Sequence, residues 1–214
     1  MKKFELTSET KINIFGKKLF RIKALISFGD VKAGETGGWV EKEENVNQSG
    51  NAWVYGDAMV SGNAMVSGNA KVYGDAMVYG DAWVYGDAMV SGNAMVSGNA
   101  MVSGNAKVYG DAWVFGNAWV SGNAKVYGDA MVSGDAKVSG DADYATIHGF
   151  GTQFRTTTFF RCKDKKVRVA CGCFFGTIPE FREQVKDTRK GKIAEEYLVI
   201  SDLMEKHFEV KSNE

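Results

Sequence analysis

At 214 residues the chain is long enough for one or two domains with a buried core. Lys plus Arg and Asp plus Glu each number 26, so net charge gives no general attraction to nucleic acid or to an anionic membrane. No segment approaches the roughly 20 apolar residues needed to cross a bilayer, and "MKKFELTSET" lacks the apolar run of a secretory signal. Three cysteines are an odd number and predict no disulfide framework. A cytoplasmic protein is therefore expected.

Residues 1–51 are predicted to form an N-terminal β cap and lead-in. The strand-like runs KINIF and LFRIKAL flank Gly16-Lys17-Lys18, which is typical of a hairpin. The Gly-rich stretch KAGETGGWV then leads into the repeats, and we expect Trp39 to plug the end of the core. A cap is needed because an open solenoid end exposes unpaired strands.

Residues 52–141 are fifteen unbroken hexads of the form Ala-x-Val-x-Gly-[Asp/Asn]. In extended backbone Ala and Val point to one side and the two x positions to the other. Gly followed by Asp or Asn tolerates left-handed backbone and supplies a corner. Each hexad is therefore one short strand and one turn, and stacked hexads build a parallel β-solenoid with an Ala/Val interior.

The fourth hexad position indicates how many strands form one coil. Taken every 18 residues from Tyr55, it gathers four of the six repeat tyrosines on one face, whereas a step of 12 scatters them. The chain therefore predicts a three-sided prism of about five coils, mainly β, with Asn and Asp stacked at the corners, where they can bond along the axis.

Large apolar residues occupy the outward second position of eleven hexads, and lysine occupies the other four. A monomer rarely leaves continuous apolar strips in water, and Met and Trp are favoured at partner surfaces. We interpret two of the three faces as oligomer or partner contacts; drift in duplicated hexads is the alternative. The candidate contact residues are Trp53, Met59, Met65, Met77, Trp83, Met95, Met101, Trp113, Trp119 and Met131.

Residues 142–214 are predicted to form a C-terminal α+β cap. TTTFFRC, a Lys-Asp-Lys-Lys turn and VRVACGC indicate a hairpin. Thr177 and Glu180 have the spacing of a capping box that opens a helix. A second helix carries Tyr197, Ile200 or Ser201, Met204 and Phe208 on one face. Both helices are expected to pack on the last coil.

The hexads resemble the left-handed β-helix family best known from hexapeptide-repeat acyltransferases, although Gly comes one residue later here. The lead-in DVKAGETGGWVEKEENVNQSGNAWVYGDA and the tail VRVACGCFFGTIPEFREQVKD are similar to those of phage- and prophage-associated hexapeptide-repeat proteins of unknown function. Some bacterial proteins of this set carry an acetyltransferase label. The resemblance implies a left-handed coil, a trimer and a phage-related role inside a bacterial host.

Catalytic residues are hard to find. The acyltransferases of this fold use a histidine near a cleft between coils, but the hexads contain none, and only His148 and His207 occur elsewhere. His148 is a weak candidate for a base, because no orienting partner is visible. No catalytic residue and no cofactor are assigned, and a non-enzyme is favoured over an acyltransferase that uses a CoA donor.

Two clusters allow other hypotheses. One possible zinc site would use the thiolates of Cys162, Cys171 and Cys173 together with His148. Their spacing is not that of a zinc knuckle, so buried thiols are favoured. Six cations could hold a phosphate-bearing ligand or nucleic acid, although a solvated hairpin is favoured. They are Arg155, Arg161, Lys163, Lys165, Lys166 and Arg168.

The leading hypothesis is an oligomeric β-solenoid that scaffolds copies of itself, or binds another phage or host protein, through its apolar faces. No membrane contact is expected.

Overall fold

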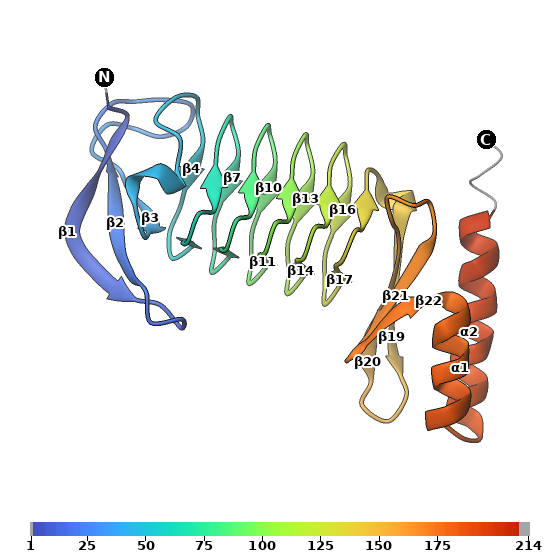
Figure 1. The fold of residues 1–214 in the computed structure, drawn as a ribbon. Coiled ribbons are helices and arrows are strands. Elements are labelled where there is room, and N and C mark those ends of the chain that lie inside the picture. The colour runs from blue at the N-terminus through green and yellow to red at the C-terminus, as the bar shows by residue number, and fades with distance from the viewer. Residues whose placement is uncertain (1, 210–214) are drawn as a thin grey trace.

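The fold was analysed in a computed structural model that describes residues 2–209. Figure 1 shows a row of stacked coils with an antiparallel hairpin at the N-terminal end and a small sheet with two helices at the C-terminal end. In the part of the chain described, no helix combines the length and the apolar character needed to cross a membrane.

The predicted N-terminal hairpin is present, but its first strand begins earlier in the chain than the run KINIF, of which only Lys11 and Ile12 belong to it. Strand β1 (Phe4–Ile12) pairs antiparallel with β2 (Lys18–Ala24), and β2 pairs with β3 (Thr36–Val40). Gly16 lies in the turn with a φ of 73°, which a residue without a Cβ adopts readily. A short 3₁₀ helix, η1 (Glu43–Asn45), follows β3 and precedes the repeats.

Each hexad contributes one two-residue strand. These strands are β4 (Trp53–Val54), β5 (Met59–Val60), β6 (Met65–Val66), β7 (Lys71–Val72), β8 (Met77–Val78), β9 (Trp83–Val84), β10 (Met89–Val90), β11 (Met95–Val96), β12 (Met101–Val102), β13 (Lys107–Val108), β14 (Trp113–Val114), β15 (Trp119–Val120), β16 (Lys125–Val126), β17 (Met131–Val132) and β18 (Lys137–Val138).

Strands three hexads apart pair in parallel and form the three sheets of the prism (Figure 1). Met59 lies opposite Met77, so the step between coils is 18 residues as predicted. The lead-in adds a sixth coil to the predicted five, because Trp39 of β3 pairs with Met59 and Val46 forms a bridge with Val66.

The interior is the predicted column of small apolar side chains. The Ala and the Val of every hexad are at most 1% exposed, which confirms that these two positions face inward. The corner glycines have left-handed backbone, with φ of 58° to 74° from Gly56 to Gly134. A Cβ built on Gly98 would lie 3.1 Å from both the backbone N and O of Gly116 on the next coil. Glycine is therefore required by both conformation and close stacking.

Asparagines at the corners form the predicted ladders along the axis. The side-chain amide of Asn99 donates to Oδ1 of Asn117 at 3.1 Å, and that of Asn93 donates to Oδ1 of Asp111 at 2.8 Å. An aspartate can accept such a bond but cannot donate the next one.

The N-terminal end is closed differently from the prediction. Trp39 is buried, but its register with Met59 puts it on the outer side of the sheet, so its expected role as an interior plug is wrong. There Arg21 lies over its ring, and its indole N–H donates to Asp57 at 3.3 Å. Lys3, 2% exposed, instead donates to the backbone O of Ala52 at 2.9 Å at the end of the coil. Burial lowers the pKa of Lys3 to about 8.

The C-terminal cap begins with a 3₁₀ turn, η2 (Asp141–Asp143), and continues into a four-stranded antiparallel sheet. Its strands are β19 (Tyr144–Phe150), β20 (Arg155–Arg161), β21 (Val167–Cys171) and β22 (Phe174–Thr177). The predicted hairpin is β20 and β21. The outer strands, β19 and β22, are additional to the prediction.

Two helices follow, α1 (Ile178–Thr188) and α2 (Lys192–Glu209). The capping box is confirmed, since the Glu180 backbone N–H donates to Thr177 Oγ1 and the Thr177 backbone N–H donates to Glu180 Oε2. The predicted apolar faces of both helices are buried, but against the sheet. Phe159 of β20 packs in the helical cluster, whereas its neighbour Phe160 packs in the solenoid core. The expectation that the helices pack on the last coil is therefore wrong, because the sheet lies between them (Figure 1).

Candidate functional site

Two faces of the prism carry the predicted apolar columns. We define the first apolar face by Met59, Met77, Met95, Trp113 and Met131, which stand in one parallel sheet. We define the second apolar face by Met65, Trp83, Met101, Trp119 and Lys137 in the next sheet. The third sheet presents Trp53, Lys71, Met89, Lys107 and Lys125, together with four tyrosines, and is called the tyrosine face.

The side chains of the two apolar faces lie on the outside of the prism, as predicted. Most are partly exposed, because each lies in register over its neighbour on the next coil, as Met77 does over Met95. Trp83 protrudes furthest and is 49% exposed. Each row therefore forms a continuous apolar surface from which most side chains protrude only a little.

Two tryptophans are held in place by the serines of the preceding coil. The indole N–H of Trp119 donates to Ser103 Oγ at 3.0 Å, and that of Trp113 donates to Ser97 Oγ at 3.3 Å. Both serines are buried. Each ring thus covers a polar group and turns an apolar surface outward, in one fixed orientation.

Trp53 does not belong to an accessible surface. It is fully buried, with the rings of Phe4 and Phe28 edge-on at 5.8 and 5.4 Å. The prediction that Trp53 contacts a partner is therefore wrong. The other nine candidates remain outside the prism.

The first apolar face continues onto the C-terminal cap. Phe115, Met131 and Phe175 line a cavity of about 330 Å³ there, and Phe175 is 49% exposed. A Cβ on Gly134 would lie 2.6 Å from the Phe175 ring, so the ring rests directly on this corner. This extension has no counterpart in the sequence analysis, because β22 is an addition to the predicted cap.

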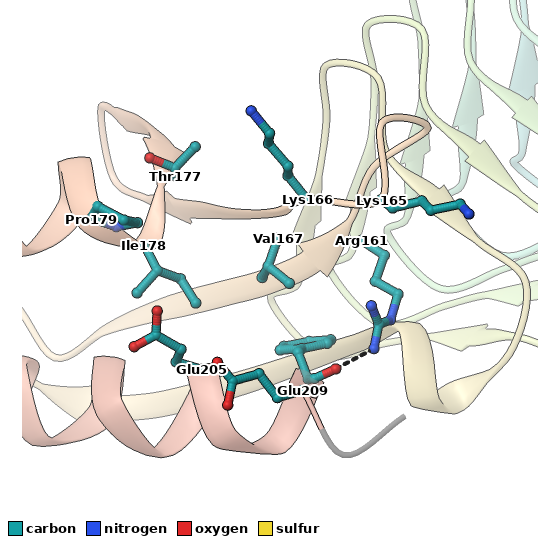
Figure 2. Close-up of a pocket in the computed structure, with 10 residues that line it drawn as sticks. Arg161, Lys165, Lys166, Val167, Thr177, Ile178, Pro179, Glu205 and Glu209 are labelled. Atoms are coloured by element: carbon teal, nitrogen blue, oxygen red, sulfur yellow. Dashed lines mark hydrogen bonds between the residues drawn. The ribbon is translucent and has the colours of Figure 1, made fainter. Parts of the chain in front are cut away.

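The basic hairpin contributes to a second cavity, of about 460 Å³, between β20, β21 and the two helices (Figure 2). Arg161, Lys165 and Lys166 stand at its edge over an apolar floor that includes Val167 and Ile178. Figure 2 shows the two lysine side chains extending in different directions, while the Arg161 guanidinium is bound to the backbone O of Phe208. The cations therefore do not converge on one point.

The other three predicted cations lie away from that cavity. Arg168 pairs with Asp164 at 2.8 Å, Lys163 donates to the backbone O of Asn117 at 3.3 Å, and Arg155 lies beside Gly172. The six residues are thus distributed over the cap and do not form a single track.

His148 and the cysteines are also placed apart. His148 is exposed, with Nδ1 3.0 Å from Thr156 Oγ1. Cys162 faces the solenoid core, Cys171 packs on the helical side of the sheet, and Cys173 is exposed in a turn. Burial raises the pKa of the Cys162 thiol to about 11. Within residues 2–209 no three His, Cys, Asp or Glu side chains gather as metal ligands would, so the zinc set written from the sequence does not assemble.

One further cleft contains none of the predicted site residues. Tyr109, Tyr127 and Tyr144 meet Lys125, Asp141 and His207 where the tyrosine face joins the cap. The tyrosine column was visible in the 18-residue pattern, but nothing in the sequence placed His207 beside it.

Comparison with known proteins supports the solenoid. Residues 52–68, 70–86, 82–97 and 124–140 match a family model described as YdcK Beta solenoid repeat. The chain is also 37% identical over 65 residues to a protein of Escherichia coli (strain K12) named "Uncharacterized acetyltransferase YdcK". That match covers 26% of this chain and 19% of the relative, so it spans about a fifth of the relative's length. The hexads of this chain are therefore β-solenoid repeats similar to those of YdcK.

Proposed function

We propose that this protein is a non-catalytic scaffold whose solenoid assembles with further copies of the same chain through its two apolar faces. The single observation that carries the proposal is the pair of outward Met and Trp columns that run the length of the prism. Exposed apolar strips of this continuity are typical of interaction surfaces.

The arrangement of the three faces favours a closed ring of copies. If the first apolar face of one copy packs on the second apolar face of the next, the contact is heterologous and closes when the rotation allows. Adjacent sheets of a three-sided prism make a ring of three the natural solution. The tyrosine face, with Lys107 and Lys125 exposed, then stays in water.

A second copy also fits because its axial repeat is identical. Strands recur about every 4.8 Å along each prism, so every rung of one copy can meet a rung of the other. Trp83, Trp113 and Trp119 are suited to anchor such a contact, because tryptophan contributes strongly to binding when it is desolvated. Two of these rings are already oriented by serine.

The test compares methionines at the same hexad position on different faces. Met95→Lys and Met101→Lys place a charge in the middle of the first and second apolar faces. Met89→Lys is the matched control on the tyrosine face, between Lys71 and Lys107. All three methionines are partly exposed, and four other hexads have lysine at this same position.

Sedimentation velocity should show an oligomer for the unaltered chain and for M89K, and a shift to monomer for M95K and M101K. A clean monomer for the unaltered chain in dilute buffer, or equal dissociation of all three variants, would disprove self-assembly through these faces.

The setting of this scaffold is also proposed. The similarity of the lead-in and the tail to phage- and prophage-associated proteins supports a phage-related role. The unpaired thiols of all three cysteines support a reducing, cytoplasmic location.

An acyltransferase is the second candidate, supported by the printed name of the YdcK relative. It would need a CoA donor to bind the assembled protein. Acetyl-CoA titrated calorimetrically into the oligomer should give a saturable heat if this candidate is right, and no heat if the protein is a scaffold alone.

A further inference from the structure

We infer that the cleft between the tyrosine face and the C-terminal cap binds a neutral saccharide. The cleft has a volume of about 550 Å³, within the range of ligand pockets in proteins. Three separate segments build it: the last coils supply Tyr109, Lys125 and Tyr127, the start of β19 supplies Tyr144, and α2 supplies His207. A site of this kind exists only when the cap is docked on the solenoid.

The tyrosines form a rigid aromatic wall. The rings of Tyr109 and Tyr127 are stacked at 5.4 Å with an interplanar angle of 14°, one coil apart. Tyr144, 8% exposed, meets Tyr127 edge-on at 6.4 Å. Tyr127 itself is 51% exposed and so offers ring surface to a ligand. The apolar C–H face of a pyranose ring packs well on such a surface.

Polar groups around the wall suit hydroxyl groups. The Asp141 carboxylate is fixed because Oδ1 accepts the backbone N–H of Lys125 at 2.8 Å, which leaves the carboxylate able to accept further hydrogen bonds. The Lys125 ammonium can donate, and the His207 ring has both a donor and an acceptor nitrogen when neutral. A sugar hydroxyl both donates and accepts, so it can use each of these groups.

Charge balance distinguishes this cleft from the basic cavity of the cap. One lysine and one aspartate line it, so the formal charges offset each other. Three cations, Arg161, Lys165 and Lys166, line the basic cavity against two carboxylates, Glu205 and Glu209, so that cavity keeps an excess of positive charge. A neutral, hydroxyl-rich ligand is therefore the class that the tyrosine cleft favours.

The inference does not depend on the proposed self-assembly. The cleft lies on the tyrosine face, which the ring leaves open. A variant that dissociates the oligomer, such as M101K, should still bind the saccharide.

The test begins with an array of immobilised neutral oligosaccharides, which is probed with the labelled full chain. AMP immobilised on the same array is the comparison, because it is aromatic but carries negative charge. A retained glycan is then titrated against Tyr127→Ser and His207→Ala. Tyr73→Ser is the matched control, because Tyr73 occupies the same column but does not line the cleft. Serine occurs at this hexad position in Ser91, so both tyrosine variants should fold.

We expect at least one neutral glycan to be retained, with affinity reduced about tenfold or more in Y127S, reduced in H207A and unchanged in Y73S. Retention of no glycan, stronger retention of AMP than of any glycan, or equal losses in Y127S and Y73S would each overturn the inference.

Discussion

The solenoid and its C-terminal cap bury their apolar side chains in different ways. In the solenoid each hexad repeats the same Ala and Val pair, and an interior strand such as β11 pairs with the strands one coil before and one coil after it. In the cap one sheet separates two cores, since Phe160 faces the coils and Phe159 faces the helices. The solenoid can therefore lengthen by duplication, whereas the cap must be built once.

This difference explains where specific contacts concentrate. A repeated rung offers the same surface many times, which suits a periodic partner. The ends interrupt that periodicity and gather unlike side chains, as the cleft beside Tyr144 and the cavity beside Phe175 show.

Replacing Phe159 or Phe160 by Ala tests the two-core comparison with the largest effect. Each change should cost about 3–5 kcal/mol of unfolding free energy, because a fully buried aromatic ring is lost. Hydrogen exchange should rise in α1 and α2 for F159A, and in β17 and β18 for F160A. Leucine at either position is the milder version if Ala prevents folding. The same exchange pattern in both variants would show that the cap has one core.

Lys3 tests whether the N-terminal end is closed by a buried cation. Its pKa of about 8 lies below the ordinary 10.5, so between these values the unfolded chain binds more protons than the folded chain. The stability of the unaltered protein relative to Lys3→Met should therefore rise by up to about 3 kcal/mol as pH increases from 8 to 10.5. Urea unfolding across this range measures it.

Cys162, with its pKa raised to about 11, has the opposite slope above pH 9, but it is common to both proteins and cancels in the difference. Lys107→Met removes an exposed lysine and is the control. A difference between unaltered protein and K3M that does not change with pH would contradict the assignment.

Substitutions of corner glycines test how an interior coil differs from the last coil. Gly110 and Gly128 are in one column with φ of 74° and 64°, but an added Cβ lies 2.9 Å from the next backbone N only at Gly110. G128A should cost about 1 kcal/mol for its conformation alone, and G110A should cost about 1–3 kcal/mol more. Thermal unfolding of the two variants gives the comparison, and equal losses would mean that stacking adds no constraint.

The corner ladders should give the smallest effect. Asn99→Asp removes the donor to Asn117 and puts a carboxylate next to Asp81 on the preceding coil, at a cost of about 0.5–1.5 kcal/mol. Asp75→Asn makes the reverse change in another column and should stabilise slightly. Denaturant midpoints that move in the same direction for both would argue against ladder bonding.

Much of the fold could be predicted because the same local rule, a short strand with inward Ala and Val followed by a glycine turn, recurs in all fifteen hexads. The inward Val and the outward Met follow from that rule, whereas the 18-residue step follows from the column of tyrosines at the variable fourth position. Trp39 lies outside the core because Trp39-Val40 has the phase of a hexad's second and third positions, as its pairing with Met59 and Val60 shows. The sequence therefore already contained the signal for its outward position. The burial of Trp53 could not be predicted, because the rings that cover it, Phe4 and Phe28, come from a segment without periodicity.

The sequence by itself determined the coil, its small-residue interior and the two outward apolar columns, because these depend on strand alternation, a repeated turn and the 18-residue spacing of the tyrosines. Only the tertiary structure decided which surfaces remain open and which side chains converge on them. Those outcomes depend on the docking of aperiodic segments, such as β19 and α2, onto the ends of the prism, and contacts between segments far apart in the chain leave no local pattern to read.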